Sequence, residues 1–237
     1  MKRSILLILI TCLLAACNSQ PSTTTADTPV VNPEEVEGYL LQDDVKNINE
    51  HLDYTASELK TIYFAGGCFW GVEAYFARIY GVADTVSGYA NGTGENPSYE
   101  EVIQGDKAFV ETVKVTYDPE RVSLDELIEH LFSVIDPTSK NKQGNDVGIQ
   151  YRSGIYYDEA MDATTVEEAI KKEQQQYDKP IVTEAEPLQN FYLAEEYHQD
   201  YLVKNPNGYC HINLQTFDTL PINPIAKDEM IVQKLSK

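Results

Sequence analysis

The stretch Gly66-Gly67-Cys68-Phe69-Trp70-Gly71-Val72-Glu73 joins two segments of different periodicity. Before it, residues 61–65 form a short apolar run that predicts a β-strand. After it, apolar side chains recur at helical spacing as far as residue 79, which predicts an amphipathic helix. Cys68 is therefore expected at a strand-to-helix junction, where two glycines allow the backbone to turn sharply.

This position predicts a reactive thiol at Cys68. The first amide N–H groups of a helix have no partner within the helix, and the helix dipole is positive at that end. A thiolate there is stabilised, so we expect the pKa of Cys68 to be lowered. The alternative is a buried structural cysteine beside Phe69 and Trp70, the only tryptophan in the chain.

The composition limits the classes of partner. The chain has 237 residues, a net charge of −20 and 42% hydrophobic residues. These values predict one folded domain of roughly 160 residues. The strong negative charge argues against nucleic acid or an anionic membrane surface as a partner.

The first residues have the pattern of an export signal. Lys2 and Arg3 precede an apolar stretch at 5–14, which is too short for a convincing membrane span. Leu14-Ala15-Ala16-Cys17 resembles a bacterial lipoprotein signal, which implies cleavage before Cys17 and lipidation of its thiol. The alternative is an ordinary secretory signal.

These features predict the organisation of the chain. We expect a signal peptide at 1–16, a lipidated cysteine and flexible tether at 17–57, a folded domain at 58–217 and a tail at 218–237. The Ser/Thr/Pro-rich composition of residues 19–33 favours such a tether. The predicted location is the cell envelope, with the chain lipid-anchored to a bacterial membrane and facing the periplasm or the exterior.

The number of cysteines is informative in that compartment. Of the four cysteines, Cys12 lies in the signal and Cys17 would carry lipid, so the folded domain keeps Cys68 and Cys210. In an oxidising compartment, such a pair is either a structural disulfide or a redox couple. The helix-start position of Cys68 favours a redox couple.

A carboxylate interrupts an otherwise apolar strand face. Residues 109–117 alternate, and one face carries Phe109, Glu111, Val113, Val115 and Tyr117. We expect Glu111 to be buried with a raised pKa, because desolvation disfavours the charged form. A neutral acid near a thiol can donate a proton. The alternative is that this face opens to solvent near the end of the strand.

The remaining pattern predicts the fold class. Strands are expected at 82–90, 153–157 and 181–186, and helices at 124–135, 158–179 and 194–204. Ser123 and Glu126 form a capping box before the first of these helices. No βαβ repeat is long enough for a doubly wound sheet, so we predict an α+β two-layer sandwich with a ferredoxin-like core.

Other polar residues are less specific by themselves. Tyr99, Asp146 and Tyr151 lie in or beside loops, where each, taken alone, is expected to form structural hydrogen bonds rather than to act in catalysis. None of the four histidines has metal-ligand spacing with another histidine or a cysteine, so no metal site is predicted.

These residues together resemble the A-type peptide-methionine sulfoxide reductases. The resemblance runs from about residue 61 to about residue 214. It is carried, in order, by Gly66-Gly67-Cys68-Phe69-Trp70-Gly71, Asn96-Pro97-Ser98-Tyr99, Glu111 to Pro119, Asp136-Pro137-Thr138, Gln143 to Gly148, Gln150 to Ser153, Tyr197-His198-Gln199 and Asn205 to Cys210.

The resemblance implies a role for each matching residue. Phe69 and Trp70 would hold the methyl group of methionine sulfoxide. Glu111, with Tyr99 and Tyr151, would hydrogen-bond the sulfoxide oxygen.

The resemblance also implies the chemistry of the two thiols. Cys68 would attack the sulfur and become a sulfenic acid, with Asp146 helping to position it. Cys210 would then form a disulfide with Cys68, which a thioredoxin-like dithiol would reduce. We expect no other cofactor, oxidised proteins or free methionine sulfoxide as substrates, and a monomer.

Two other classes of function remain open from the residues. One is a Cys–His hydrolase or acyltransferase, with Cys68 as the nucleophile and His198 as the base. The other is a non-catalytic lipoprotein domain in which Cys68 and Cys210 form a structural disulfide.

Overall fold

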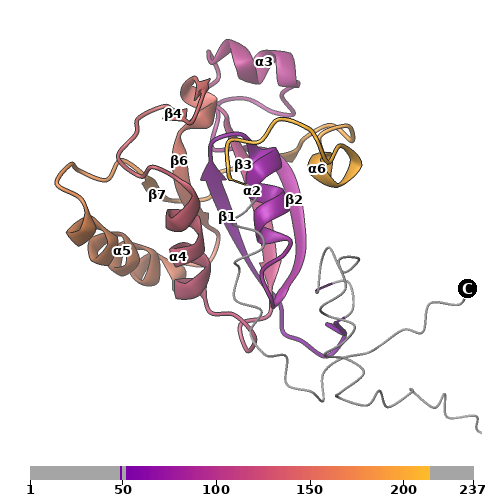
Figure 1. Cartoon of the computed structure of the whole chain (residues 1–237), viewed down its shortest axis with the longest axis vertical. Helices are drawn as coiled ribbons and strands as arrows, with labels where there is room; N and C mark the ends of the chain where they lie inside the picture. Colours follow the sequence, from indigo (N-terminus) through magenta and orange to yellow (C-terminus); the bar gives the residue numbers. More distant parts are fainter. Residues whose placement is uncertain (1–48, 50–51, 214–237) are drawn as a thin grey trace, which may run out of the picture. The chain divides into compact units, whose positions relative to one another are not determined.

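The computed structural model describes Asn49 and residues 52–213 (Figure 1). The expected signal peptide, Cys17, most of the tether and the tail at 218–237 lie outside the described residues. Within the described part, no helix is long and apolar enough to cross a membrane.

A six-stranded sheet forms the centre of the domain. Its strand order is β7-β6-β1-β3-β2-β8, and neighbours are antiparallel except for the parallel pair β6 and β7. A separate two-stranded ladder joins β4 and β5. The strands are β1 (Lys60–Gly66), β2 (Val82–Ala90), β3 (Val110–Tyr117), β4 (Lys142–Gln143), β5 (Asp146–Val147), β6 (Ser153–Tyr157), β7 (Glu184–Pro187) and β8 (Phe191–Leu193).

The helices complete an α+β two-layer sandwich, as the sequence predicts. In chain order they are α2 (Phe69–Phe76), α3 (Tyr99–Gln104), α4 (Leu124–Val134), the 3₁₀ turn η2 (Ile149–Tyr151), α5 (Asp162–Glu173), the 3₁₀ turn η3 (Gln174–Gln176) and α6 (Tyr201–Lys204). The chain order β1-α2-β2-β3-α4-β6 with the sheet order β6-β1-β3-β2 is that of a ferredoxin-like core.

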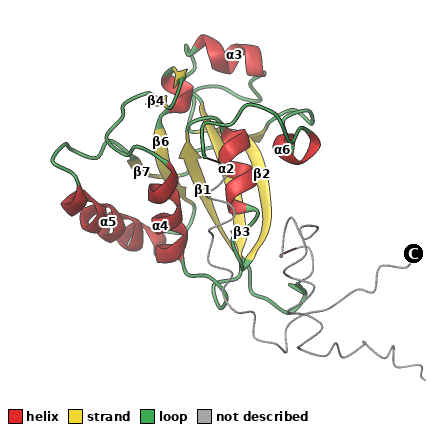
Figure 2. Ribbon diagram, in the orientation of Figure 1, coloured by secondary structure: helices red, strands yellow, loops and turns green. Residues whose placement is uncertain are grey.

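Each face of the sheet has its own apolar layer. Figure 2 shows α2 and α4 lying over one face. Val72 of α2, Leu127 of α4 and Val166 of α5 belong to the same buried cluster as the strand residues that point to this face. A smaller cluster on the other face is covered by Leu188 and Phe191. The main core therefore lies between the sheet and the helices.

The predicted alternation of β3 is confirmed. Val113, Val115 and Tyr117 join the main core, and Val110 joins the cluster on the opposite face. Glu111 is 2% exposed, so its face does not open to solvent. The structure therefore points a carboxyl group into the core, opposite Tyr89 of β2.

The segment before α6 differs from the predicted helix at 194–204. Only Tyr201–Lys204 is α-helical, and β8 pairs with the end of β2 just upstream. Asp200 has φ 50°, a left-handed conformation that interrupts a right-handed helix. The Gln199 amide bonds to the backbone of Ser87, so this segment follows β2 closely.

Two other predicted elements are shifted at their ends. The helix expected at 158–179 is α5 followed by η3. The strand expected at 181–186 begins later, as β7. Residues 138–150 are mainly irregular, but they contain the β4–β5 ladder.

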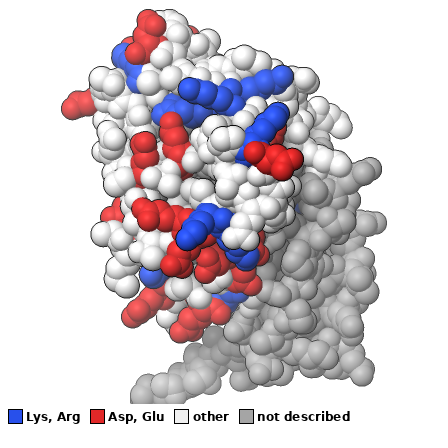
Figure 3. Space-filling view, turned by 90° about the vertical axis from the view of Figure 1, so that its left-hand side faces the viewer, with Lys and Arg blue, Asp and Glu red and all other residues white. Residues whose placement is uncertain are grey.

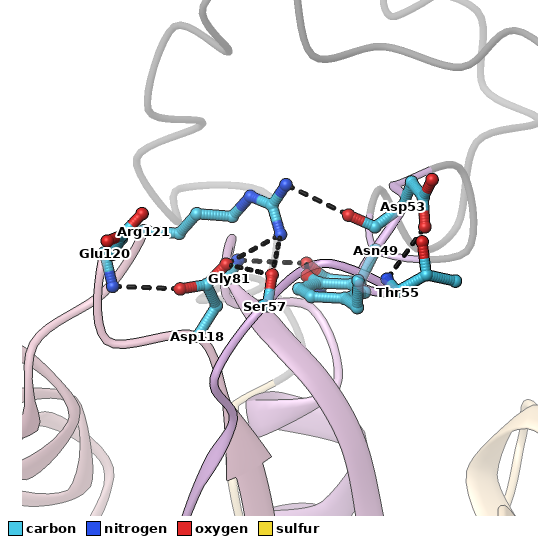
Figure 4. A network of polar contacts seen from close by, with 9 residues as sticks. Asn49, Asp53, Thr55, Ser57, Gly81, Asp118, Glu120 and Arg121 are labelled. Carbon is cyan, nitrogen blue, oxygen red and sulfur yellow. Dashed lines mark hydrogen bonds and ion pairs between the residues drawn. The ribbon is translucent and has the colours of Figure 1, made fainter.

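Asn49 and residues 52–57 form an N-terminal strap against the domain (Figure 4). Asn49 Nδ2 donates to the carbonyl oxygens of Ala77 and Ile79 at 2.8 and 2.9 Å, and its Oδ1 accepts from Gly81 N at 3.1 Å. These groups lie at and beyond the carboxyl end of α2. The strap belongs to residues expected to form a flexible tether, so the packed region begins before residue 58.

Arg121 fixes the second half of the strap. Its guanidinium pairs with Asp118 at 2.8 Å, donates to the Asp53 carbonyl oxygen at 3.1 Å and to Ser57 Oγ at 3.3 Å, and lies over the Tyr54 ring at 4.7 Å. Asp118 and Arg121 directly follow β3. The strap is therefore at the end of the sheet where β1 begins, whereas Cys68 lies just beyond the end of β1.

Charged side chains of both signs are mixed on the face of the domain in Figure 3. A row of basic side chains crosses the upper part of this view, and acidic side chains lie on both sides of it.

Candidate active site

Cys68 occupies the predicted junction between β1 and α2. It is the N-cap residue of α2 and is 7% exposed. Gly67 has φ 88°, and a Cβ at this position would lie 2.6 Å from Gln143 Cβ. Glycine is therefore required before Cys68, because any side chain would collide with the loop that carries β4.

The expected lowering of the Cys68 pKa is wrong. Burial raises the pKa of this thiol, and the negative charge of nearby Glu111 raises it further. The backbone N–H of Trp70 stabilises the thiolate, as expected for a helix start, but its effect is the smaller one. Cys68 is therefore a thiol at neutral pH.

Glu111 lies at the same end of α2. Its Oε2 accepts a hydrogen bond from Phe69 N at 3.1 Å. Burial raises the pKa of Glu111 to about 8, against the lowering effect of that hydrogen bond. The predicted direction of the shift is confirmed, and Glu111 is mainly a neutral acid at pH 7.

Tyr99 and Tyr151 lie beside this pair. Their hydroxyl groups are hydrogen-bonded to each other, and burial and the Glu111 charge raise the pKa of both. Tyr99 is the first residue of α3, after the capping box formed by Ser98 and Glu101. Both phenols therefore remain protonated and can donate hydrogen bonds near Glu111.

Four rings form an aromatic wall next to Cys68: Phe69, Trp70, His198 and Tyr201. The Trp70 ring stacks on Tyr201 with centroids 3.7 Å apart, and Trp70 Nε1 donates to His198 Nδ1 at 3.1 Å. The His198 ring also lies 5.0 Å from the Phe69 ring. The sequence singled out Phe69 and Trp70, but it did not predict that His198 and Tyr201 hold Trp70.

His198 has a different role from the base of a Cys–His hydrolase. Its Nδ1 accepts from Trp70, so Nδ1 carries no proton, and burial lowers the pKa of the ring. Among the described residues, no hydrogen bond joins His198 to Cys68. The structure therefore does not form the Cys68–His198 pair of that alternative.

Cys210 lies over the first turn of α2. Its Sγ would be 3.0 Å from a Cβ at Gly71, so a side chain at this position would crowd the sulfur. Cys68 and Cys210 are both free thiols, and burial raises the pKa of Cys210 as well. The structure therefore places both thiols of the domain at the amino end of one helix.

Asp146 and His211 line the same region. Asp146 Oδ2 accepts from the Tyr209 hydroxyl at 3.0 Å, and the Asp146 charge contributes to the raised pKa of both thiols. His211 Nε2 donates to the Gly66 carbonyl oxygen at 2.8 Å. The sequence did not predict this contact of His211, which ties the segment after Cys210 to the glycines before Cys68.

Two surface hollows lie elsewhere. One of about 260 Å³ is lined by residues of 139–153 and 182–184, and one of about 450 Å³ by residues of 135–138 and 176–179. Neither includes Cys68, Glu111 or the aromatic wall. Within the described residues, no group of three or more His, Cys, Asp and Glu side chains could hold a metal ion.

A buried thiol beside a neutral carboxylic acid, with a second thiol packed against the first turn of the same helix, is typical of a thiol-dependent oxidoreductase. Comparison with known proteins identifies which one. Residues 60–228 match the family model described as peptide methionine sulfoxide reductase. A peptide methionine sulfoxide reductase MsrA of Mycoplasma genitalium is 58% identical over 154 residues, which cover 65% of this chain and 98% of that protein.

Solved structures agree with this result. Reduced Mxr1 from Saccharomyces cerevisiae is similar with a TM-score of 0.64 and 38% identity, covering 68% of this chain and 95% of that one. Methionine sulfoxide reductase A of Corynebacterium diphtheriae has a TM-score of 0.62 and 39% identity, covering 64% and 77%. The chain belongs to the MsrA family of peptide methionine sulfoxide reductases, which are oxidoreductases.

Proposed function

We propose that the chain reduces methionine S-sulfoxide, free or within proteins, through a Cys68 sulfenic acid and a Cys68–Cys210 disulfide that a thioredoxin-like dithiol recycles. The observation that carries this proposal is the neutral Glu111 carboxyl at the helix start that holds Cys68.

The substrate would bind against the aromatic wall. Phe69 and Trp70 would receive the methyl group, because aromatic rings bury apolar groups well. Tyr99, Tyr151 and Glu111 carry O–H donors that lie near one another and near Cys68. They would direct the sulfoxide oxygen away from the apolar wall and toward the acid.

The charges of the two reacting groups explain why Glu111 must be neutral. An ionised Glu111 raises the pKa of Cys68, so two negative charges in this buried site oppose each other. With Glu111 protonated, the Cys68 thiolate loses that repulsion. The favoured combination is therefore a protonated Glu111 beside a Cys68 that becomes a thiolate during the attack.

The first half-reaction moves the oxygen atom from the substrate sulfur to Cys68. The Cys68 sulfur attacks the sulfoxide sulfur while Glu111 protonates the oxygen. The oxygen then bonds to the Cys68 sulfur, both the substrate sulfur–oxygen bond and the newly formed sulfur–sulfur bond break, and methionine leaves with the electron pair of the latter. The thiol proton and the oxygen end together on Cys68 as a sulfenic acid, with Glu111 protonated again, so atoms and protons balance.

The second half-reaction uses the thiol of Cys210. It attacks the Cys68 sulfenic sulfur, forms the disulfide and releases water. Its position over Gly71 supports this step, because it packs against the first turn of α2, which Cys68 caps. The charge of Asp146 acts on both thiols. Asp146 would position the hydrogen-bond network around them.

Cys210→Ser tests the resolving step. We expect the variant to release about one equivalent of methionine per chain at the parent rate, because Cys68 and Glu111 are intact. Turnover supported by thioredoxin should fall by about tenfold or more, and dithiothreitol should restore turnover by reaching Cys68 directly. Parent rates with thioredoxin would exclude Cys210 as the resolving residue.

We also propose that lipid on Cys17 anchors the chain to a bacterial membrane. The motif Leu14-Ala15-Ala16-Cys17 supports this proposal. The strap supports its geometry, because the chain enters the domain at the end of the sheet opposite Cys68. An anchor attached upstream of the strap would leave the catalytic end accessible to oxidised proteins and to the reductant.

Cys17→Ala is expected to move the chain from the membrane fraction to the soluble or mislocalised fraction, since stable anchoring requires the acyl chains. Its activity in vitro should equal that of the parent, because the substitution changes none of the residues of the candidate active site. Cys12→Ala is the matched control and should leave fractionation unchanged. Equal detergent partitioning of the Cys17→Ala variant and the parent would contradict the anchor.

A further inference from the structure

Glu73 is a buried carboxyl group that the proposed chemistry does not use. It lies one helical turn after Phe69 on α2 and is 3% exposed. Burial raises the pKa of Glu73 to about 7, and the charge of Asp200 adds to this effect. Such a group is costly to bury, so its hydrogen-bond partners indicate what it does.

Its partners are two backbone N–H groups from distant parts of the chain. Oε1 accepts from Ser87 N at 3.2 Å, and Oε2 accepts from Asp200 N at 2.9 Å. Glu73 thus connects the catalytic helix both to β2 and to the segment before α6. Trp70 also connects α2 to that segment, through its hydrogen bond to His198.

The two N–H groups differ in whether they have a second acceptor. Ser87 N also donates to Gln199 Oε1 at 3.0 Å, so it keeps an acceptor without Glu73. Asp200 N has Glu73 as its only acceptor among the described residues. Asp200 is also in a left-handed conformation at φ 50°, which a residue with a side chain rarely adopts without support.

Asp200 lies between the two residues that hold Trp70. Two positions before it, His198 accepts from Trp70 Nε1, and one position after it, Tyr201 stacks on the indole ring. A change at the Asp200 turn therefore moves both contacts of Trp70 together. The Glu73 carboxyl is the group of α2 that fixes this turn.

We infer that Glu73 is a positioning residue: by accepting the Asp200 N–H it fixes the turn that holds His198 and Tyr201 against Trp70, and so shapes the methyl-binding side of the site. Glu73 does not touch the substrate. The inference rests on the assignment of Trp70 to substrate binding under the proposed function.

Trp70 provides a direct readout, because it is the only tryptophan in the chain. Its fluorescence reports the surroundings of the aromatic wall without any need for activity. Three variants of the full chain are compared: Glu73→Met, which removes both acceptor oxygens, Glu73→Gln, which keeps one acceptor oxygen, and Val166→Ala as a control. Val166 is fully buried in α5, away from the wall, so its truncation lowers stability without touching Trp70.

We expect Glu73→Met to raise KM for methionine sulfoxide by about tenfold, the usual effect of one hydrogen bond to a charged group. Its rate constant at saturation should stay within about twofold of the parent, because Cys68 and Glu111 are unchanged. The Trp70 emission should move to longer wavelength. Glu73→Gln should restore both properties, since its amide oxygen can accept from Asp200 N and Ser87 N retains Gln199.

The control separates positioning from stability. Val166→Ala should unfold at a lower temperature while keeping the parent KM and emission. A Glu73→Met variant with parent KM and emission would overturn the inference. Equal changes of KM and emission in Glu73→Met and Glu73→Gln would overturn it as well. The loss of the negative charge, and not the loss of the acceptor oxygen, would then be the cause.

Two further outcomes are decisive. A shifted emission with unchanged KM would support the contact between Glu73 and the wall and would overturn the role of Trp70 in substrate binding. If Glu73→Met does not fold, amide hydrogen exchange in the parent decides the question. Slow exchange at Asp200 N supports the inference, whereas exchange as fast as at the exposed residues of α6 would overturn it.

Discussion

Cys68→Ser is expected to abolish reduction of methionine S-sulfoxide, lowering the rate of the first half-reaction by about 10⁴-fold or more. A serine hydroxyl has similar size and would keep the helix start intact. It cannot attack the sulfoxide sulfur as a thiolate does, nor can it form the disulfide that follows. The measurement is methionine released in a single turnover.

Cys210→Ser is the matched control for this variant, because it is the same substitution at the other thiol of the domain. It should keep the first turnover that Cys68→Ser loses. Methionine release by Cys68→Ser at the parent rate would show that Cys68 is not the nucleophile.

Glu111→Gln is expected to slow the first half-reaction by about 10²–10⁴-fold, the usual contribution of a general acid. The amide can still accept the Phe69 N–H but has no acidic proton to give. In the parent, the rate of this step should fall as pH rises through about 8, where Glu111 loses its proton. The rate of the Glu111→Gln variant should not fall over this pH range.

Glu111→Gln should stabilise the folded chain, although it slows the first half-reaction. Glu111 has a raised pKa in the folded state, so between the unfolded value and about 8 the folded chain binds more protons than the unfolded chain. The free energy of unfolding therefore decreases as pH rises through this range. Glu111→Gln removes that cost, so its stability relative to the parent should increase between pH 5 and pH 8.

Asp162→Asn is a control for Glu111→Gln at a buried carboxyl remote from the site. Asp162 is 6% exposed on α5, and burial raises its pKa as well. This control should leave the rate of methionine release unchanged. A folded Glu111→Gln variant with the parent rate would mean that Glu111 is structural.

The backbone of the site could be predicted from local patterns. The change from a strand run to helical spacing placed Cys68 at the start of α2, and alternation in β3 buried Glu111. Both features depend on neighbours in sequence, which a single chain displays directly. The sandwich followed from the order of these elements.

The electrostatics of Cys68 could not be predicted in the same way. A helix start lowers the pKa of an exposed thiol, but Cys68 is 7% exposed and faces Glu111. Glu111 is 43 positions further along the chain, and only the pairing of the strands brings it to the helix start. The desolvation and the opposing charge are therefore tertiary effects.

The supports of the site also arise from tertiary contacts. His198 and Tyr201 reach Trp70 because Asp200 adopts a left-handed conformation, which residues 194–204 do not signal. His211 meets the Gly66 carbonyl because the chain returns to β1 after Cys210. The strap likewise depends on Arg121, which lies 64 positions after Ser57 in the sequence.

One measurement tests the central claim most directly. The reduced protein is mixed with an excess of methionine S-sulfoxide in the absence of any reductant, and both products are analysed. We predict about one equivalent of methionine per chain, together with loss of two hydrogens and a peptide that links Cys68 to Cys210. No methionine release, or methionine release with both thiols still free for alkylation, would contradict the account.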